Sequence, residues 1–255
     1  MSALRAGLTL QLRMFRSDPD ALMQLLTAPI FAVVFLSIVR HAGREDLTPY
    51  AVLAPVLIAL WWLALAQAGV IVEGDRGQGV IEAVIAAPSS YPLVVLGRVL
   101  IVTVVGLSSF VEVWLIARFA FGLEVPVHHP GTLGLTLTAT ALAMVGTSVI
   151  IAAVFVLTRT ATTLLISLTW PFHVLGGVLV PVAFLPDWIE PVTRIVFLSW
   201  SSDLLRASLA VEPIDDLGAR LGTIVLLGAG GYLLGRLLLE RFLRRARLHG
   251  TLGHT

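Results

Sequence analysis

The sequence contains no cysteine, no lysine and no asparagine among its 255 residues. Without cysteine, the chain has neither a disulfide framework nor a thiolate metal site. Without lysine, it lacks the Walker A motif, whose lysine holds a nucleotide phosphate. If ATP drives this protein, another chain must bind it, so we expect no cofactor on this one. The joint absence of lysine and asparagine is typical of a GC-rich gene and indicates a bacterial source.

Charged residues are also scarce. They make up 13% of the chain, hydrophobic residues make up 57%, and the mean hydropathy is +0.94. Soluble domains carry about 25% charged residues, so this composition is typical of an integral membrane protein. The net charge of +1 says nothing about nucleic acid, and no basic, aromatic-rich pattern in the sequence indicates a nucleic-acid partner, so we expect none.

Hydropathy predicts an all-α membrane protein with six transmembrane helices. The predicted spans are residues 21–39, 50–72, 93–117, 133–157, 161–180 and 221–239. Before them, residues 1–17 place Arg5, Arg13 and Arg16 on one arc of a helical wheel, which predicts an amphipathic helix lying at the membrane interface. After them, residues 240–255 form a basic tail.

The segment 184–209, between the fifth and sixth predicted spans, is too polar to cross a bilayer and too apolar for a free loop. Pro186 and Pro191 interrupt it, and Trp188 and Trp200 suit a membrane interface. We expect short helices that form a re-entrant segment in the outer leaflet.

The distribution of arginine predicts the orientation. With the amino terminus inside, 11 of the 17 arginines lie on the inner side and six on the outer side. This arrangement puts both termini and the loop at residues 73–92 in the cytoplasm.

The cytoplasmic loop carries a polar pattern. Asp75, Gly79 and Glu82 have the spacing i, i+4 and i+7, so on a helix they share one face. Gly74 and Gly77 are expected to separate this short helix from the preceding span. Two carboxylates beside a glycine could receive another protein, although an ordinary acidic surface loop is the alternative.

Three groups of residues carry a family resemblance. Asp75-Arg76-x-x-Gly79-x-Ile81-Glu82, then Ala87-Pro88-x-Ser90, then Leu96-Gly97-Arg98 resembles the signature of ABC-2 type transport permeases. The later series Gly176-Gly177, Leu185-Pro186-x-Trp188 and Asp203-Leu204-Leu205-Arg206 is similar to the same family.

The resemblance implies that the loop couples to a separate ATP-binding ATPase subunit, which would hold ATP and Mg. It also implies a second permease subunit, giving a homodimer or a homologous heterodimer in the lipid membrane. The implied coupling residues are Asp75, Arg76, Gly79, Glu82 and Pro88.

Candidate pathway residues are Glu112, Trp188, Asp203 and Arg206. A carboxylate inside a span is expensive in lipid, so Glu112 must face protein, water or a partner charge. Glu112 either contacts the substrate or forms a structural pair with an outer arginine such as Arg118, Arg194 or Arg206.

Other motifs indicate packing rather than chemistry. His128, His129 and His173 lack the spacing of a metal site. The glycines from Gly228 to Gly235 lie within a span, so they predict close helix packing and not a nucleotide loop. No serine has a histidine and carboxylate context, so we expect no catalytic residues and no enzyme activity on this chain.

These features predict the permease subunit of an ABC exporter in the bacterial inner membrane. Its substrate would be hydrophobic or amphipathic, such as a drug, an antibiotic or a lipid-like molecule, and would leave the cytoplasm or the inner leaflet. Two alternatives stay open: a polysaccharide or lipid-linked glycan exporter of the same family, and a gradient-driven secondary transporter. Two repeats of opposite membrane topology would favour the latter, but residues 21–120 and 133–239 show no convincing duplication.

Overall fold

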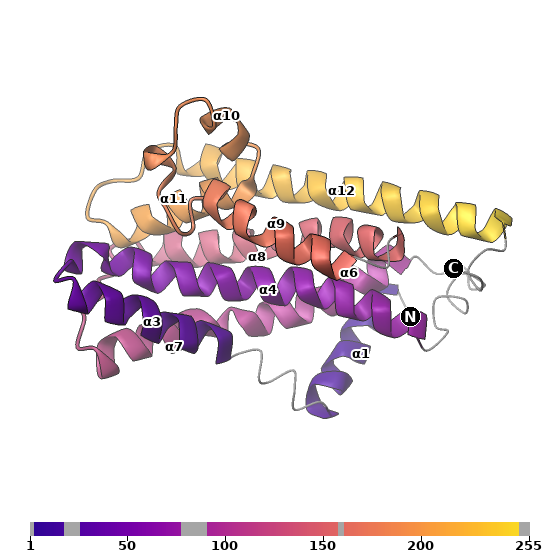
Figure 1. Cartoon of the computed structure of the whole chain (residues 1–255), viewed down its shortest axis with the longest axis horizontal. Helices are drawn as coiled ribbons and strands as arrows, with labels where there is room; N and C mark the ends of the chain where they lie inside the picture. The colour runs from indigo at the N-terminus through magenta and orange to yellow at the C-terminus, as the bar shows by residue number, and fades with distance from the viewer. Residues whose placement is uncertain (1–2, 18–25, 78–90, 158–160, 250–255) are drawn as a thin grey trace.

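The computed structural model describes residues 3–17, 26–77, 91–157 and 161–249. All regular elements in these ranges are helices, most of them running along one long axis (Figure 1), which confirms the all-α prediction. The long helices are α1 (Ala3–Ser17), α3 (Thr27–His41), α4 (Thr48–Gly77), α6 (Tyr91–Gly106), α8 (Pro130–Leu157), α9 (Ala161–Leu175), α11 (Phe197–Leu209) and α12 (Leu217–His249). The shorter elements are η2 (Glu45–Leu47), α7 (Ser108–Leu115), the π-helical η3 (Ile116–Ala120), η4 (Val182–Phe184) and α10 (Glu190–Thr193).

Four helical segments of the described chain are long and apolar enough to cross a membrane: Thr48–Asp75, Tyr91–Ala120, Pro130–Val156 and Leu217–Arg241. They correspond to the second, third, fourth and sixth predicted spans. The remaining two predicted spans correspond to shorter helices, since α3 and α9 have 15 residues each. Residues 21–25 of the predicted first span lie outside the described ranges.

The helix α9 ends earlier than its predicted span. Residues 161–180 were expected to be helical, but the helix stops at Leu175. Gly177 has φ of +65°, and the Val178 amide donates to the carbonyl of His173, so the chain turns at this point. A glycine in the left-handed conformation is a common helix end. At 1.5 Å per residue, α9 is about 22 Å long, shorter than the hydrocarbon core.

The helix α4 is the centre of the bundle. Ala51 to Leu65 are almost entirely buried, with Trp62 as an exposed exception. The helix also continues through Gly74 to Gly77, although these glycines were expected to separate it from the next helix. Asp75 is therefore part of α4, and the contacts described below hold it there.

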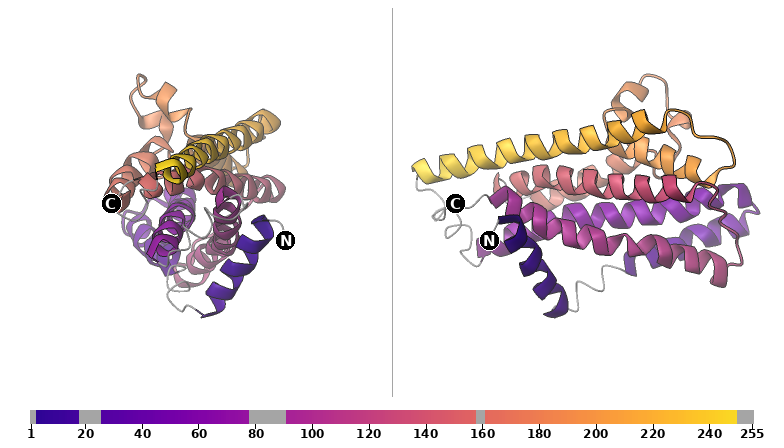
Figure 2. Two further views of the ribbon diagram at one scale, coloured as in Figure 1. Left: turned by 90° about the vertical axis from the view of Figure 1, so that its right-hand side faces the viewer. Right: turned by 180° about the vertical axis from the view of Figure 1, so that it is seen from behind.

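Glycines let α12 lie directly against α8. A Cβ on Gly235 would be 2.5 Å from the Ile150 amide nitrogen, and one on Gly228 would overlap the backbone of Ala143. Figure 2 shows the two helices side by side in both views. The predicted packing role of these glycines is confirmed, except that Gly230 faces open space. The helix α12 continues to His249, so most of the predicted basic tail is helical.

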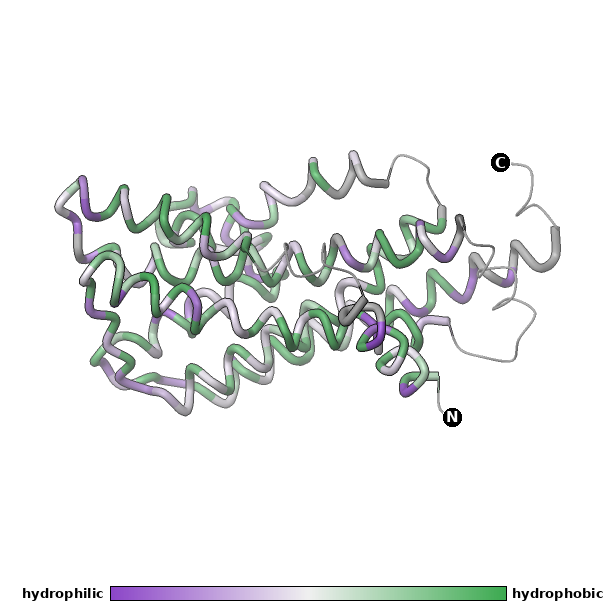
Figure 3. The backbone as a smooth tube through the Cα atoms, turned by 90° about the horizontal axis from the view of Figure 1, so that it is seen from below, coloured by the Kyte–Doolittle hydropathy of each residue, from purple (hydrophilic) through white to green (hydrophobic). Residues whose placement is uncertain are grey.

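The bundle has two polar ends and a long apolar middle (Figure 3). One end, called here the terminal end, holds α1 and the end of α12 (Figure 1). The opposite end holds η2, α10 and the start of α12 (Figure 1). Candidate functional residues gather at each.

Candidate functional site

A buried polar network joins three helices at the terminal end. The Arg98 guanidinium on α6 donates from Nη1 to Oδ1 of Asp75 on α4, at 3.0 Å. The Tyr91 hydroxyl donates to the other carboxylate oxygen of Asp75 at 2.9 Å. Arg98 Nε donates to Oε1 of Gln11 on α1 at 3.1 Å. All four residues are buried, and we call them the inner network.

The helix α1 reaches this network because two glycines remove the side chains between it and α6. A Cβ on Gly97 would lie 2.6 Å from the carbonyl oxygen of Leu4, and one on Gly7 would overlap the carbonyl of Val94. The face of α1 that carries Gly7 and Gln11 is buried, whereas Arg5 and Arg13 are exposed. The amphipathic pattern of residues 1–17 thus corresponds to a helix with one face packed on α6.

The predicted coupling residues have different outcomes. Asp75 is 9% exposed and turns toward Tyr91 and Arg98, whereas it was expected to share an acidic docking face. The structure describes the backbone of Arg76 within α4, and Gly79, Glu82 and Pro88 lie outside the described residues. Their coupling role stays a prediction.

Sequence reasoning missed Tyr91 and Gln11 and used Arg98 only as part of a motif. Asp75 lies near the end of α4 and Tyr91 is the first residue of α6. Their hydrogen bond therefore joins the two helix ends on either side of residues 78–90. A signal was present in the sequence, because opposite charges stand at facing ends of two consecutive apolar segments.

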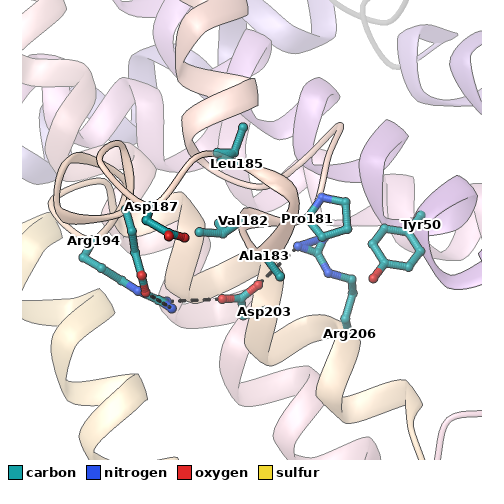
Figure 4. A pocket seen from close by; sticks show the side chains of 10 residues that line it. Tyr50, Pro181, Val182, Ala183, Leu185, Asp187, Arg194, Asp203 and Arg206 are labelled. Atoms are coloured by element: carbon teal, nitrogen blue, oxygen red, sulfur yellow. Dashed lines mark hydrogen bonds and ion pairs between the residues drawn. The ribbon is translucent and has the colours of Figure 1, made fainter.

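A second polar cluster lies at the opposite end. Asp203 on α11 accepts from two arginines, Arg194 Nη1 and Arg206 Nη2, each at 3.3 Å. Arg206 also donates from both terminal nitrogens to the carbonyl of Gly177, at 2.8 and 2.7 Å. Its guanidinium lies 4.8 Å from the centre of the Tyr50 ring (Figure 4). We call Arg194, Asp203 and Arg206 the outer cluster.

The outer cluster fixes the turn after α9. Arg206 is held by the backbone of that turn and by Ser202, whose hydroxyl donates to the carbonyl of Gly176 at 2.7 Å. Burial lowers the pKa of the Arg206 guanidinium, and the neighbouring Asp203 carboxylate raises it in part. A desolvated arginine with four hydrogen bonds and an aromatic partner is a rigid group.

A cavity of about 520 Å³ opens beside this cluster (Figure 4). Its wall includes Asp203 and Arg206, which the sequence analysis had assigned to the pathway. Trp188 does not line it and is 77% exposed.

Glu112 lies apart from the outer cluster, on α7. Its carboxylate accepts from the Ser108 hydroxyl at 2.9 Å, one helical turn earlier. The arginines considered as partners pair with other acids: Arg118 with Glu124, and Arg194 and Arg206 with Asp203. The structural ion pair, one of the two alternatives for Glu112, is therefore not formed with these arginines, and the role in the pathway stays a prediction.

The histidines are also separated. The His129 ring contacts the carbonyl of Glu212 at 3.0 Å, whereas His173 is buried against the Trp61 ring, with centroids 5.6 Å apart. Within the described ranges, no three histidine, aspartate or glutamate side chains gather as a metal site would require.

Comparison with known proteins places these features in a family. A family model described as ABC-2 type transporter matches residues 8–210, a range that contains the inner network and the outer cluster. No curated protein matches the chain. The membrane domain of this family is a transport permease without an ATPase site of its own, and it normally works with a separate ATPase subunit. The chain therefore belongs to the ABC-2 type transporter family.

Proposed function

We propose that this chain is the permease subunit of an ATP-driven exporter in a bacterial inner membrane. Two permease subunits, identical or homologous, would form the pathway, and separate ATPase subunits would bind ATP and Mg. The terminal end would face the cytoplasm, as the arginine distribution predicts. The cargo would be a hydrophobic or amphipathic molecule, moved outward from the cytoplasm or the inner leaflet.

The inner network is the observation that supports this proposal. Residues 78–90 connect α4 to α6, and the network ties together the two helix ends on either side of them. Asp75 lies two residues before the end of α4, and Tyr91 is the first residue of α6. A force applied to the connection would reach both helices at once.

The network would also transmit the force from one helix to the next. Separating the two partners of a buried ion pair is costly, because each charge would stay desolvated and unpaired. Movement of the connection would therefore carry α4, α6 and, through Gln11, the helix α1 together. Since α4 is the centre of the bundle, its displacement changes the packing of most other helices. Asp75 then acts as a positioning residue, while Glu82 and Arg76 are the proposed contacts with the ATPase.

The test needs the chain together with a candidate ATPase subunit, sought among the neighbouring genes by its Walker motifs. Both would be purified together and reconstituted in lipid vesicles, where ATP hydrolysis and dye export are measured. Glu82→Arg reverses the proposed docking charge, and Asp215→Arg makes the same reversal at the opposite end. We expect Glu82→Arg to abolish ATP-dependent export while the protein still inserts in the membrane, and Asp215→Arg to export normally.

Two results would overturn the proposal. The first is export by Glu82→Arg at the wild-type rate. The second is export by the chain alone that stops when ion gradients are collapsed, which would instead identify a secondary transporter. Stimulation of ATP hydrolysis by a lipid-linked glycan, and not by amphipathic drugs, would select the glycan exporter.

A further inference from the structure

We propose that two adjoining hollows at the opposite end of the bundle form one binding site for an amphipathic cation. The apolar part of the ligand would occupy one hollow and its cationic group the other. This inference depends on the proposed function only for the statement that the ligand is cargo, since binding itself needs no ATPase.

The apolar hollow has a volume of about 620 Å³. It lies where the end of α3, the start of α4 and the chain after α9 come together, and its wall includes Phe35, Ile38, Ala54, Leu179 and Phe184. Ile38 and Phe184 are 59% and 78% exposed, so part of the wall is formed by exposed, large apolar side chains. Such a surface suits an aliphatic or aromatic ligand group.

The polar hollow is the 520 Å³ cavity beside the outer cluster. It shares two wall residues with the apolar hollow, Tyr50 and Pro181, so the two adjoin. Figure 4 shows Arg206 beside the Tyr50 ring and Asp187 on the far side of the same cavity. Each hollow falls within the range of about 300–1,000 Å³ that is typical of ligand pockets.

The charges of the polar hollow favour a cation. Its wall carries three carboxylates, from Asp187, Glu190 and Asp203, and two guanidinium groups. Both guanidinium groups are already engaged: Arg206 with Asp203 and a backbone carbonyl, and Arg194 with Asp203 and Glu190. The Asp187 carboxylate, by contrast, forms no ion pair or hydrogen bond with the described residues. One negative charge is therefore left for a ligand.

The described side chains at the rim of the apolar hollow add no net charge. Arg44 and Asp46 form a bidentate pair there, with both nitrogen–oxygen distances at 2.8 Å. Among the described residues of both walls, an anionic ligand would consequently find no unengaged cation, whereas an amine or a quaternary ammonium group would find Asp187.

The experiment measures binding to the purified chain in lipid nanodiscs without ATPase. The probes are radiolabelled dodecyltrimethylammonium and radiolabelled dodecanoate, which have similar apolar chains and opposite charges. Both are used far below the concentrations at which they form micelles, and binding to empty nanodiscs is subtracted. We expect saturable binding of the cation and none of the anion.

Two variants test the two hollows separately. Asp187→Asn removes the unengaged charge and should weaken cation binding about two- to fivefold, the effect of one exposed ion pair. Phe184→Ser removes an exposed apolar wall and should weaken it about tenfold. Asp215→Asn and Phe119→Ser are matched controls, because both residues are exposed and line neither hollow. The controls should bind as the wild type does.

Three results would overturn the inference: no saturable binding of the cation, equal binding of the anion, or equal losses in the controls. A fourth result would also overturn it, namely that a second copy of this chain, and not a ligand, fills the apolar hollow. Because the chain has no native cysteine, Phe184→Cys provides a single thiol. Efficient disulfide formation between two such chains would mean that a neighbouring subunit covers the apolar hollow.

Failure of export with intact cation binding would contradict the proposed function and leave this site standing.

Discussion

The substitution Arg98→Met tests the inner network most directly. It replaces the apolar stem of the arginine by an unbranched apolar side chain and removes the guanidinium that donates to Asp75 and Gln11. Asp75 would keep one donor, the Tyr91 hydroxyl, and would carry its charge at a position only 9% exposed. Removing one partner of a buried ion pair costs about 3–5 kcal/mol. The unpaired Gln11 carbonyl adds a smaller cost of about 1–3 kcal/mol, which overlaps with the first.

The magnitude can be measured as an apparent unfolding midpoint. In a domain of this size, 1 kcal/mol corresponds to about 2–4 °C, so Arg98→Met should lower the midpoint by about 6–20 °C. The purified chain would be heated in nanodiscs at one fixed scan rate while tryptophan fluorescence is recorded, because unfolding of such proteins is usually irreversible. Arg244→Met, an exposed arginine in α12, is the control and should change the midpoint little.

A double-mutant cycle separates the ion pair from general damage. Asp75→Asn together with Arg98→Met removes both charges, so the double variant should be more stable than the sum of the two single losses predicts. Replacement of a whole buried pair is often nearly neutral. The reasoning is refuted if Arg98→Met melts within about 2 °C of the wild type, or if the two losses simply add.

Three further predictions follow from close packing and from the outer cluster. Gly97→Leu should detach α1 from α6, because the new side chain meets the Leu4 backbone; protease cleavage within α1 should become faster, and unchanged cleavage would contradict the contact. Gly228→Leu should destabilise the chain by about 1–3 kcal/mol through overpacking against α8. Gly230→Leu, whose site is open, should change the free energy of unfolding by less than about 0.5 kcal/mol. Equal destabilisation by Gly228→Leu and Gly230→Leu would argue against the packing. Arg206→Lys should cost about 1.5–3 kcal/mol, because an ammonium cannot reproduce the forked bonds to the Gly177 carbonyl, and a melting midpoint like that of the wild type would count against the outer cluster.

Hydropathy predicted the order of the helices well, because apolar length is a property of each segment alone. The second, third, fourth and sixth predicted spans have matching long helices. The glycines of α12 were also interpretable, since small residues at helical spacing indicate close approach whichever helix is the partner. Where α9 ends was not predicted. Apolar residues continue through Val180, and the left-handed turn at Gly177 depends on Arg206, which lies 29 positions later.

The orientation of Asp75 could not be predicted for a similar reason. Spacing along the chain identified residues that would share one face of a short separate helix, whereas Asp75 lies within α4 and Gly79 and Glu82 lie outside the described residues. It does not identify which neighbour that face meets. The neighbours are Arg98, 23 positions away, and Gln11, which is 87 positions from Arg98. Such contacts depend on how α1, α4 and α6 pack together.

The two polar groupings can be connected through α4. This helix carries Asp75 of the inner network near one end and Tyr50, which contacts Arg206, near the other. Its length, 30 residues at 1.5 Å each, is about 45 Å, so one continuous helix, with Pro55 inside it, links the proposed ATPase contact to the proposed cation site. A shift of α4 along its axis would move Tyr50 relative to Arg206, which the turn after α9 holds in place. The wall shared by the two hollows would then change shape when ATP is consumed, and cation affinity should differ between the ATP-bound and nucleotide-free complex. Equal affinities in the two states would argue that α4 does not carry the signal.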